Sequence, residues 1–123
     1  LKTYKGKWKL LVELENETDI LNLTPNFSLL TQLESNGIIV TSKGTNVDFV
    51  SRFFAPKIGI NEDPVTGSAH TLLIPFWAKK LNKNSLEAIQ LSKRTGYLKC
   101  VYLNNRVEMS GQAITYLKGH LTI

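Results

Sequence analysis

The sequence predicts an α+β domain in which a mainly antiparallel sheet wraps around one central helix. Two observations lead to this prediction: the longest segment with helical spacing is also the most apolar one, and strand-like segments flank it on both sides. The order β, α, β, β, α and then further strands is typical of such a domain. With 123 residues, of which 42% are hydrophobic, the chain is expected to form a single domain over residues 1–123.

The N-terminal part of the chain predicts a strand, a loop and a short helix. Residues 6–14 alternate lysines with bulky apolar side chains, as a strand with one solvated face does, and residues 16–19 are turn formers. Thr24 is expected to cap a helix in which Pro25 is the first residue. This helix should end before Gly37.

A pair of strands is expected next. Residues 38–41 are rich in β-branched side chains and follow a glycine, and residues 47–54 alternate enough to form the partner strand. The intervening residues 43–46 have the composition of a turn.

The most apolar helix is expected to begin at Ser68 and to continue to Leu81, because apolar residues recur at helical spacing between them. Pro75 lies inside this helix and lacks the N–H of a backbone hydrogen bond, so tertiary burial must stabilise the helix. The remaining expected features are strands at residues 88–91, 96–103 and 106–117, a hairpin turn at Asn104-Asn105, a bulge or bend at Gly111 and a further strand at residues 119–123.

The net charge of the chain is +5, but its cations are not clustered as nucleic-acid binding requires. The nearest approach to a cluster alternates with Tyr4 and Trp8, and it predicts the solvated face of a strand: Lys2, Lys5, Lys7 and Lys9. No nucleic-acid partner is therefore expected, although a mildly basic domain could also attract small anionic metabolites. No apolar run is long enough to span a bilayer, so no membrane association is expected either.

Cys100 is the only cysteine of the chain. One cysteine can form neither an intramolecular disulfide nor a thiolate zinc cluster, which favours a reducing compartment, the cytoplasm. Because Cys100 lies in an expected strand, it is interpreted as a small core residue.

The segment from Arg52 to His70 runs from small and acidic residues directly into the apolar helix. The first N–H groups of a helix lack internal partners and lie at its positive end, so Thr66, Gly67 and Ser68 could bind a carboxylate or phosphate. The alternative is that Thr66 or Ser68 only caps the helix while Asp63 satisfies the loop. The residues alone leave both interpretations open.

This segment resembles the motif of phenazine-biosynthesis-like (PhzF-type) isomerases, which have the diaminopimelate-epimerase-like fold. Further matches extend over nearly the whole chain: Pro75, Trp77, Gln90-Leu91-Ser92, Arg94, Gly96, Val107, Ser110-Gly111, Ala113 and Gly119. Family members are about twice as long and consist of two similar halves, each a barrel-like sheet around a central helix. The resemblance therefore implies that this chain corresponds to the C-terminal half.

In this family the active site lies between the two halves, and the helix N-termini hold a substrate carboxylate. The resemblance assigns Gly67 and Ser68, with Thr66, to substrate binding and Asp63 to a supporting catalytic position that tunes or accepts a proton. His70 matches the last residue of the motif and is interpreted as a packed helix histidine, with a site role as the alternative. The principal catalytic glutamate belongs to the first half; Glu62 matches another position and is expected to orient the loop or pair with Arg52.

The resemblance implies an isomerase that moves a proton within a small carboxylate-bearing metabolite, with no metal and no organic cofactor. Related epimerases of this fold use two cysteines, but Asp63 stands where the thiol of this half would be expected. The expected partners are the small anionic metabolite, the N-terminal half of the same protein and a second copy in a homodimer, and the 123-residue chain alone should be inactive. The alternative function is a non-catalytic binding or interaction module that retains the fold.

Overall fold

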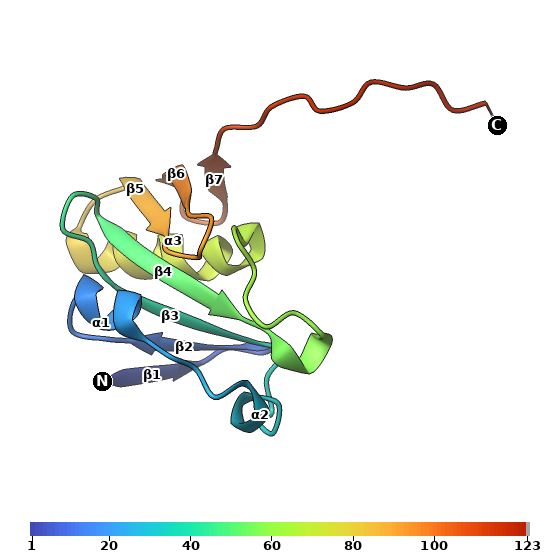
Figure 1. Ribbon diagram of the computed structural model, residues 1–123. Helices are drawn as coiled ribbons and strands as arrows, with labels where there is room; N and C mark the ends of the chain where they lie inside the picture. The colour runs from blue at the N-terminus through green and yellow to red at the C-terminus, as the bar shows by residue number, and fades with distance from the viewer. Residues whose placement is uncertain (123) are drawn as a thin grey trace.

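The computed structural model describes residues 1–122, which form one sheet with helices on both of its faces (Figure 1). The elements in chain order are β1 (Lys2–Lys5), β2 (Lys9–Glu13), α1 (Glu17–Asn22), α2 (Phe27–Leu30), β3 (Gly37–Lys43), β4 (Phe49–Phe54), the 3₁₀ helix η1 (Pro56–Ile58), α3 (Gly67–Leu81), β5 (Ser85–Gln90), β6 (Gly96–Tyr102) and β7 (Val107–Ser110). These elements confirm the predicted α+β class.

The seven strands lie in the sheet in the same order as in the chain. Four neighbouring pairs are antiparallel, and the two parallel pairs are β2 with β3 and β4 with β5. A parallel connection requires a crossover, and the chain supplies one through α1 and α2 and the other through α3. Within residues 1–122 no pairing joins β1 to β7, so the sheet is open.

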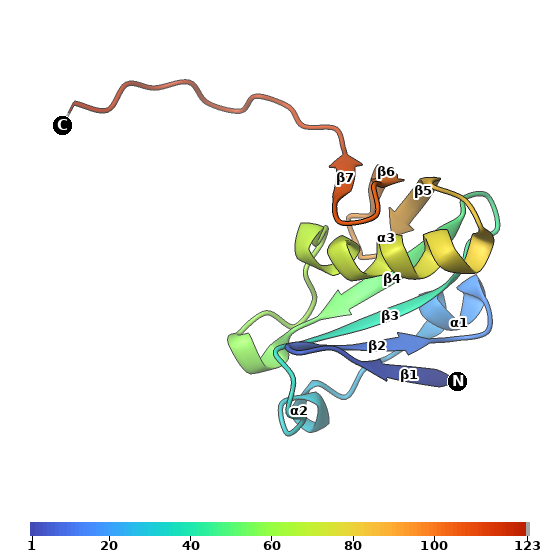
Figure 2. The same cartoon turned by 180° about the vertical axis from the view of Figure 1, so that it is seen from behind.

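Alternation along each strand divides the buried side chains between two cores. On β4, Phe49 and Phe53 point to the face that α3 covers, whereas Val50 and Phe54 point to the face that α1 and α2 cover. Figure 2 shows α3 lying across the first of these faces. The larger core contains the buried apolar residues of α3 and the smaller one contains Ile20 of α1.

Helix α3 is held by burial, as the proline within it requires. Trp77 is almost fully buried and stacks on Phe49, with ring centroids 5.8 Å apart and an interplanar angle of 3°. Its indole Nε1 donates to Thr41 Oγ1 over 3.0 Å, so the polar edge of the ring is satisfied inside the core. The helix continues through Pro75 to Leu81 and ends at Asn82, which adopts a left-handed conformation with φ of 51°.

Strands from both edges of the sheet contribute side chains to the surroundings of α3. Tyr4 of β1 packs edge-on against Phe76 at 5.2 Å, while Val107 and Met109 of β7 pack against the core cluster of the helix. The helix is therefore in contact with both ends of the sheet as well as with its middle.

One of two predictions for the N-terminal part was wrong. The strand expected at residues 6–14 is present as β2, although it begins only at Lys9. Together with β1, which was not predicted, it forms a hairpin whose turn is closed by Gly6 N–H donating to Lys9 O over 2.8 Å. The expected loop after it contains α1, because the side chain of Asn16 accepts from Asp19 N–H and caps a helix. Asparagine favours both turns and helix N-caps, so composition alone did not distinguish them.

The next helix begins later than predicted. Asn26, and not Thr24, is the N-cap, and α2 runs from Phe27 to Leu30. The strand pair that follows agrees with the prediction and is slightly longer in β3 and shorter in β4.

The C-terminal strands were predicted only in part. β6 and β7 pair across the expected turn, where Asn104 adopts a positive φ of 61°. The expected strand at residues 106–117 ends at Ser110, and Gly111 follows it instead of forming a bulge within it. Residues 111–122 are exposed and extend away from the sheet without strand partners (Figure 1), and residue 123 lies outside the described part. A strand-like composition cannot form a strand without a neighbouring strand.

No helix among residues 1–122 is long and apolar enough to cross a membrane.

Replacing Gly37 with alanine should destabilise the fold. A Cβ atom at this position would overlap the ring of Phe53, which is 6% exposed and fixed in the core. We expect the free energy of unfolding to fall by about 1–3 kcal/mol, measured by urea denaturation. Gly119→Ala is the matched control, because no atom lies within 4 Å of its added Cβ. Equal stability of the two variants would contradict the packing described here.

Candidate functional site

The candidate site is the loop that enters helix α3. This loop follows η1 and is fastened to β4 by Asp63 N–H, which donates to Phe53 O over 3.1 Å. Thr66 is the N-cap residue of α3, and Gly67 and Ser68 form the first helical positions. Asp63 therefore precedes the positive, N-terminal end of the helix by only a few residues in the chain.

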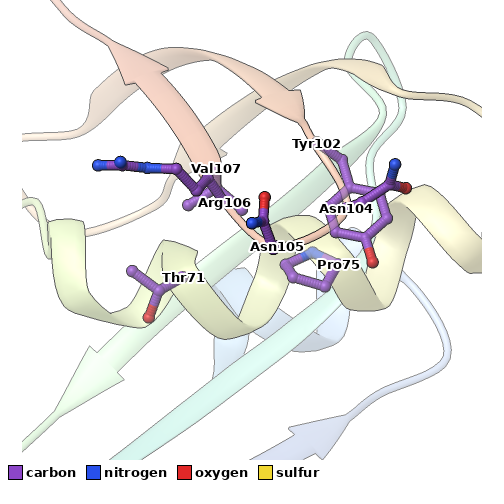
Figure 3. A pocket seen from close by; sticks show the side chains of 7 residues that line it. All are labelled: Thr71, Pro75, Tyr102, Asn104, Asn105, Arg106 and Val107. Atoms are coloured by element: carbon purple, nitrogen blue, oxygen red, sulfur yellow. The ribbon is translucent and has the colours of Figure 1, made fainter.

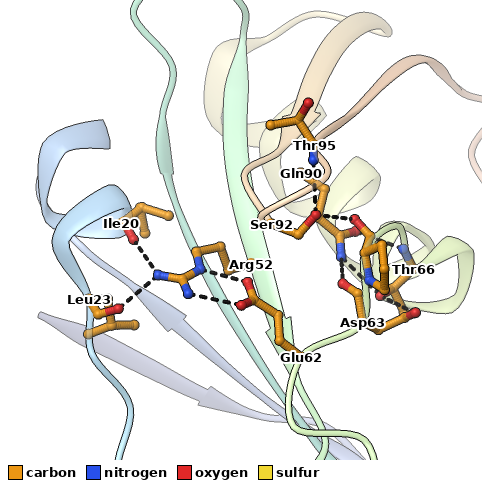
Figure 4. A network of polar contacts seen from close by, with 10 residues as sticks. Ile20, Leu23, Arg52, Glu62, Asp63, Thr66, Gln90, Ser92 and Thr95 are labelled. Atoms are coloured by element: carbon orange, nitrogen blue, oxygen red, sulfur yellow. Dashed lines mark hydrogen bonds and ion pairs between the residues drawn. The ribbon is translucent and has the colours of Figure 1, made fainter.

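Thr66 is the centre of a buried hydrogen-bond network (Figure 4). Its hydroxyl donates to Asp63 Oδ2 over 2.6 Å, and its N–H donates to Gln90 Oε1 over 2.8 Å. Gln90 in turn donates through Nε2 to Asp63 O at 2.7 Å and to Thr66 Oγ1 at 3.1 Å. The Thr66 amide is thus already occupied within the protein, although it was predicted to bind an anion with its two neighbours.

The amides of Gly67 and Ser68 differ from that of Thr66. No oxygen of residues 1–122 accepts from either N–H, and both residues are exposed. A Cβ built on Gly67 would meet only Met109 Sδ, at 3.6 Å, so a small side chain could be accommodated at this position. Two unpaired donors at the positive end of a 15-residue helix are the arrangement that binds anions.

Lys9 adds a positive charge beside these amides. Its ammonium group donates to Ser68 O over 2.7 Å and to Ser68 Oγ over 2.8 Å. Partial burial lowers the pKa of Lys9. The sequence analysis placed Lys9 on a solvated strand face with three other lysines. In the structure Lys9 lies on the same face of its strand as buried Leu11, two residues away. This two-residue spacing is the signal that could have identified Lys9 as an inward-facing residue.

Arg52 and Glu62 form a separate structural pair. The guanidinium donates to both carboxylate oxygens of Glu62, over 2.7 and 3.0 Å, as the sequence predicted. It also donates to Ile20 O and Leu23 O, which are carbonyls at the C-terminal end of α1 (Figure 4). Arg52 thus ties α1 to the site loop, and Glu62 has a structural partner that Asp63 does not share.

His70 is fully buried and faces inward from α3. Its Nδ1 lies 2.8 Å from Thr66 O, and because a carbonyl only accepts, Nδ1 carries the proton. Burial lowers the pKa of His70, which favours the neutral ring, and Nε2 has no partner among the described residues. His70 packs beside Phe49, with ring centroids 6.0 Å apart. Its only side-chain hydrogen bond among the described residues connects it to the backbone carbonyl of Thr66.

Cys100 is a core residue, as predicted. It is buried in the larger cluster, and burial raises the pKa of its thiol to about 11. A thiol with this pKa is not a thiolate at neutral pH. In the described part of the chain, no three His, Cys, Asp or Glu side chains are grouped so as to hold a metal ion.

Surface hollows adjoin the loop on one side. One, of about 690 Å³, is lined by Glu62, Pro64 and Arg94 among others, and another, of about 450 Å³, lies beside Val65 and Gly96. A third hollow of about 310 Å³ lies where Pro75 of α3 meets the β6–β7 turn, and Figure 3 shows its lining side chains. None of the residues around this third hollow belongs to the network of Thr66.

The chain matches the family model described as phenazine biosynthesis-like protein over residues 2–119. It is 50% identical over 121 residues to an uncharacterized isomerase of Halalkalibacterium halodurans and 50% identical over 115 residues to an uncharacterized isomerase of Pseudomonas aeruginosa. These alignments cover 97% and 94% of this chain but only 46% and 44% of the relatives. The chain therefore spans about half the length of the curated relatives it matches.

Solved structures give the same result. A PhzF-family phenazine biosynthesis protein of Enterococcus faecalis superposes with a TM-score of 0.90 and 47% identity, over 98% of this chain and 46% of the other. A putative phenazine biosynthesis protein of Clostridium difficile superposes with a TM-score of 0.87 and 41% identity, over 98% of this chain and 47% of the other.

The burial of His70 predicts a pH dependence of stability. The unfolded chain should protonate this histidine near its ordinary pKa of 6.5, whereas the folded pKa is lower, so the unfolded state binds more protons between the two values. The free energy of unfolding should therefore fall by about 1 kcal/mol between pH 7.5 and 5.5, measured by urea denaturation.

In His70→Asn this part of the pH dependence should disappear, because the amide can still donate to Thr66 O but does not titrate. His120→Asn, in the exposed C-terminal segment, is the matched control and should retain it. The same pH slope in His70→Asn and the unmodified chain would show that His70 is not the group responsible.

Proposed function

This chain belongs to the phenazine biosynthesis-like protein family, and we propose that it forms one half of an isomerase active site. The complete site would transfer a proton within a small metabolite that carries a carboxylate. Two curated relatives are named as isomerases, which supports an enzymatic function. The chain spans about half of their length, which supports a site divided between this half and a preceding one.

In this proposal the substrate carboxylate binds at the start of α3. The unpaired amides of Gly67 and Ser68 donate to it, and the ammonium of Lys9 lies next to them on Ser68. The helix dipole and the side-chain charge act in the same direction, so an anion is favoured over a neutral group. These open amides beside Asp63 are the observation that carries the proposal.

Asp63 would assist the proton transfer. One carboxylate oxygen is engaged by Thr66, while the residue as a whole is only half-buried, so its second oxygen can reach a bound molecule. The principal base or acid would be a glutamate of the preceding half. Neither a metal nor an organic cofactor has a part in this mechanism.

The same proposal includes the assembly. The preceding half would cover the exposed start of α3, and the open sheet would close further around this helix into the barrel-like form. We further propose that residues 1–123 act as a single unit in a cytoplasmic homodimer. A binding module without catalysis remains the competing function, and the experiments below distinguish the two.

Enlarging Gly67 should weaken anion binding in proportion to the added volume. Gly67→Ala adds a methyl group that the fold accepts, since only Met109 Sδ lies near it, at 3.6 Å. Gly67→Val adds two further methyl groups at the residue that carries one of the amides. We expect sulfate titration, followed by the amide NMR signals of Gly67 and Ser68, to give weaker binding in alanine and weakest in valine, with little change in thermal stability. Undiminished sulfate affinity in Gly67→Val would show that the anion does not bind at these amides.

Asp63→Asn should impair catalysis much more than folding. In the protein with its preceding half present, turnover should fall by about 100- to 10,000-fold, because the amide cannot carry the proton. Its oxygen can still accept from Thr66, so the free energy of unfolding should change by less than about 1 kcal/mol. The assay would follow deuterium incorporation from solvent into anionic metabolites.

Glu62→Gln is the matched control for Asp63→Asn. It breaks the ion pair with Arg52 and should lower the free energy of unfolding by about 1.5–3 kcal/mol, with a much smaller loss of turnover. The 123-residue chain alone should not exchange deuterium into any metabolite. Wild-type turnover in Asp63→Asn would leave Asp63 a structural role, and turnover by the chain alone would refute a divided site.

A further inference from the structure

We propose that Gln90 is a positioning residue that decides which oxygen of Asp63 handles the proton. Its side-chain amide makes the Thr66 hydroxyl donate to Asp63 Oδ2, which leaves Oδ1 as the oxygen that gives or takes the proton. The inference deepens the proposed function and rests on the role that function gives to Asp63.

The orientation of the Gln90 amide is fixed by two backbone groups. Oε1 lies 2.8 Å from Thr66 N–H, which can only donate, and Nε2 lies 2.7 Å from Asp63 O, which can only accept. Rotating the amide by 180° would place donor against donor and acceptor against acceptor. Gln90 is 1% exposed, so water cannot replace either bond. The side chain therefore has a single orientation.

This orientation determines the direction of the next hydrogen bond. Nε2 lies 3.1 Å from Thr66 Oγ1, and because an amide NH₂ has no acceptor capacity there, the hydroxyl oxygen must accept. The single hydroxyl proton of Thr66 then points to the other neighbour, Asp63 Oδ2, at 2.6 Å. Figure 4 shows the three side chains in this sequence.

A proton on Asp63 Oδ2 is therefore excluded, because it would face the proton of Thr66. When Asp63 is protonated, the proton lies on Oδ1, which accepts no hydrogen bond from residues 1–122 and is not among their buried unpaired atoms. Without the Nε2 donor of Gln90, Thr66 could rotate and accept from Oδ2, and the proton could then lie on the inner oxygen. Gln90 would thus keep the proton on the open side of the carboxyl group.

The position of Gln90 in the sheet suits this role. It is the last residue of β5 and is paired with Ser51 of β4 and Gly96 of β6, so strands on both sides hold its backbone. Through the hydrogen bonds of Gln90, the loop that carries Asp63 and Thr66 is held against the rigid sheet.

The first test is spectroscopic and independent of catalysis. In the unmodified protein, NMR should detect the Thr66 hydroxyl proton and both Gln90 Nε2 protons in slow exchange with solvent. Deuterating the hydroxyl should shift the ¹³C signal of the Asp63 carboxyl. A Thr66 hydroxyl proton in fast exchange, or an unchanged Asp63 signal, would overturn the proposal without any variant.

The second test separates positioning from loop anchoring. Gln90→Met keeps the volume of the side chain and removes the donor, and it should abolish the slow hydroxyl exchange. Ser92→Ala is the matched control, because Ser92 Oγ donates to Pro64 O of the same loop over 2.8 Å but makes no hydrogen bond with Thr66. Ser92→Ala should retain the hydroxyl signal, and its loss in both variants would mean that Gln90 only anchors the loop.

Kinetics distinguish this inference from the proposed function. For a metabolite that exchanges deuterium, Gln90→Met should lower kcat by up to about 100-fold with little change in KM. A normal kcat in Gln90→Met together with impaired Asp63→Asn would refute the positioning role alone. A normal kcat in Asp63→Asn would refute both.

Discussion

The burial of α3 against one face of the sheet is the constraint on which the rest of the structure depends. Trp77 fixes the helix along its axis, because its ring stacks on Phe49 and its Nε1 has one partner, Thr41 Oγ1. That hydroxyl donates in turn to Val50 O over 2.6 Å, so the contact is tied to the strands beneath it. Because the helix is fixed in this way, its N-terminus is held beside Gln90 and Lys9.

The polar groups near that N-terminus fall into two classes. Those facing the sheet are satisfied inside the protein at Thr66, Gln90 and His70 Nδ1, with the exception of His70 Nε2, which is buried without a partner among residues 1–122. Those facing outward, the amides of Gly67 and Ser68, have no partner in the described chain. An unpaired polar group is tolerable where water or a ligand can reach it and costly where neither can. The division between the two classes therefore marks where a ligand can approach.

Much of this arrangement could be predicted from the sequence where a local pattern has one physical outcome. The spacing of apolar residues between Ser68 and Leu81 predicts α3, which the structure contains. The family motif is the basis on which Asp63 and the amides after Thr66 are proposed as site groups. The loop containing α1 could not be assigned, because an asparagine caps helices and forms turns equally well. The strand expected at residues 106–117 ends at Ser110. A strand needs a neighbouring strand to pair with, and the local sequence does not show where such a neighbour ends.

The roles of Lys9 and Gln90 could not be read from local patterns, because each depends on strand register. Both are polar residues on the buried side of a strand, which is a detectable signal, but their partners lie 59 and 27 residues away in the chain. Such separations also have a kinetic consequence. Contacts between distant residues form late in folding, after the loop between them has closed. A chain in which α3 has not yet docked cannot bring Gln90 to Asp63, so a partly folded molecule has no assembled site, and a ligand that binds there selects only the fully folded state.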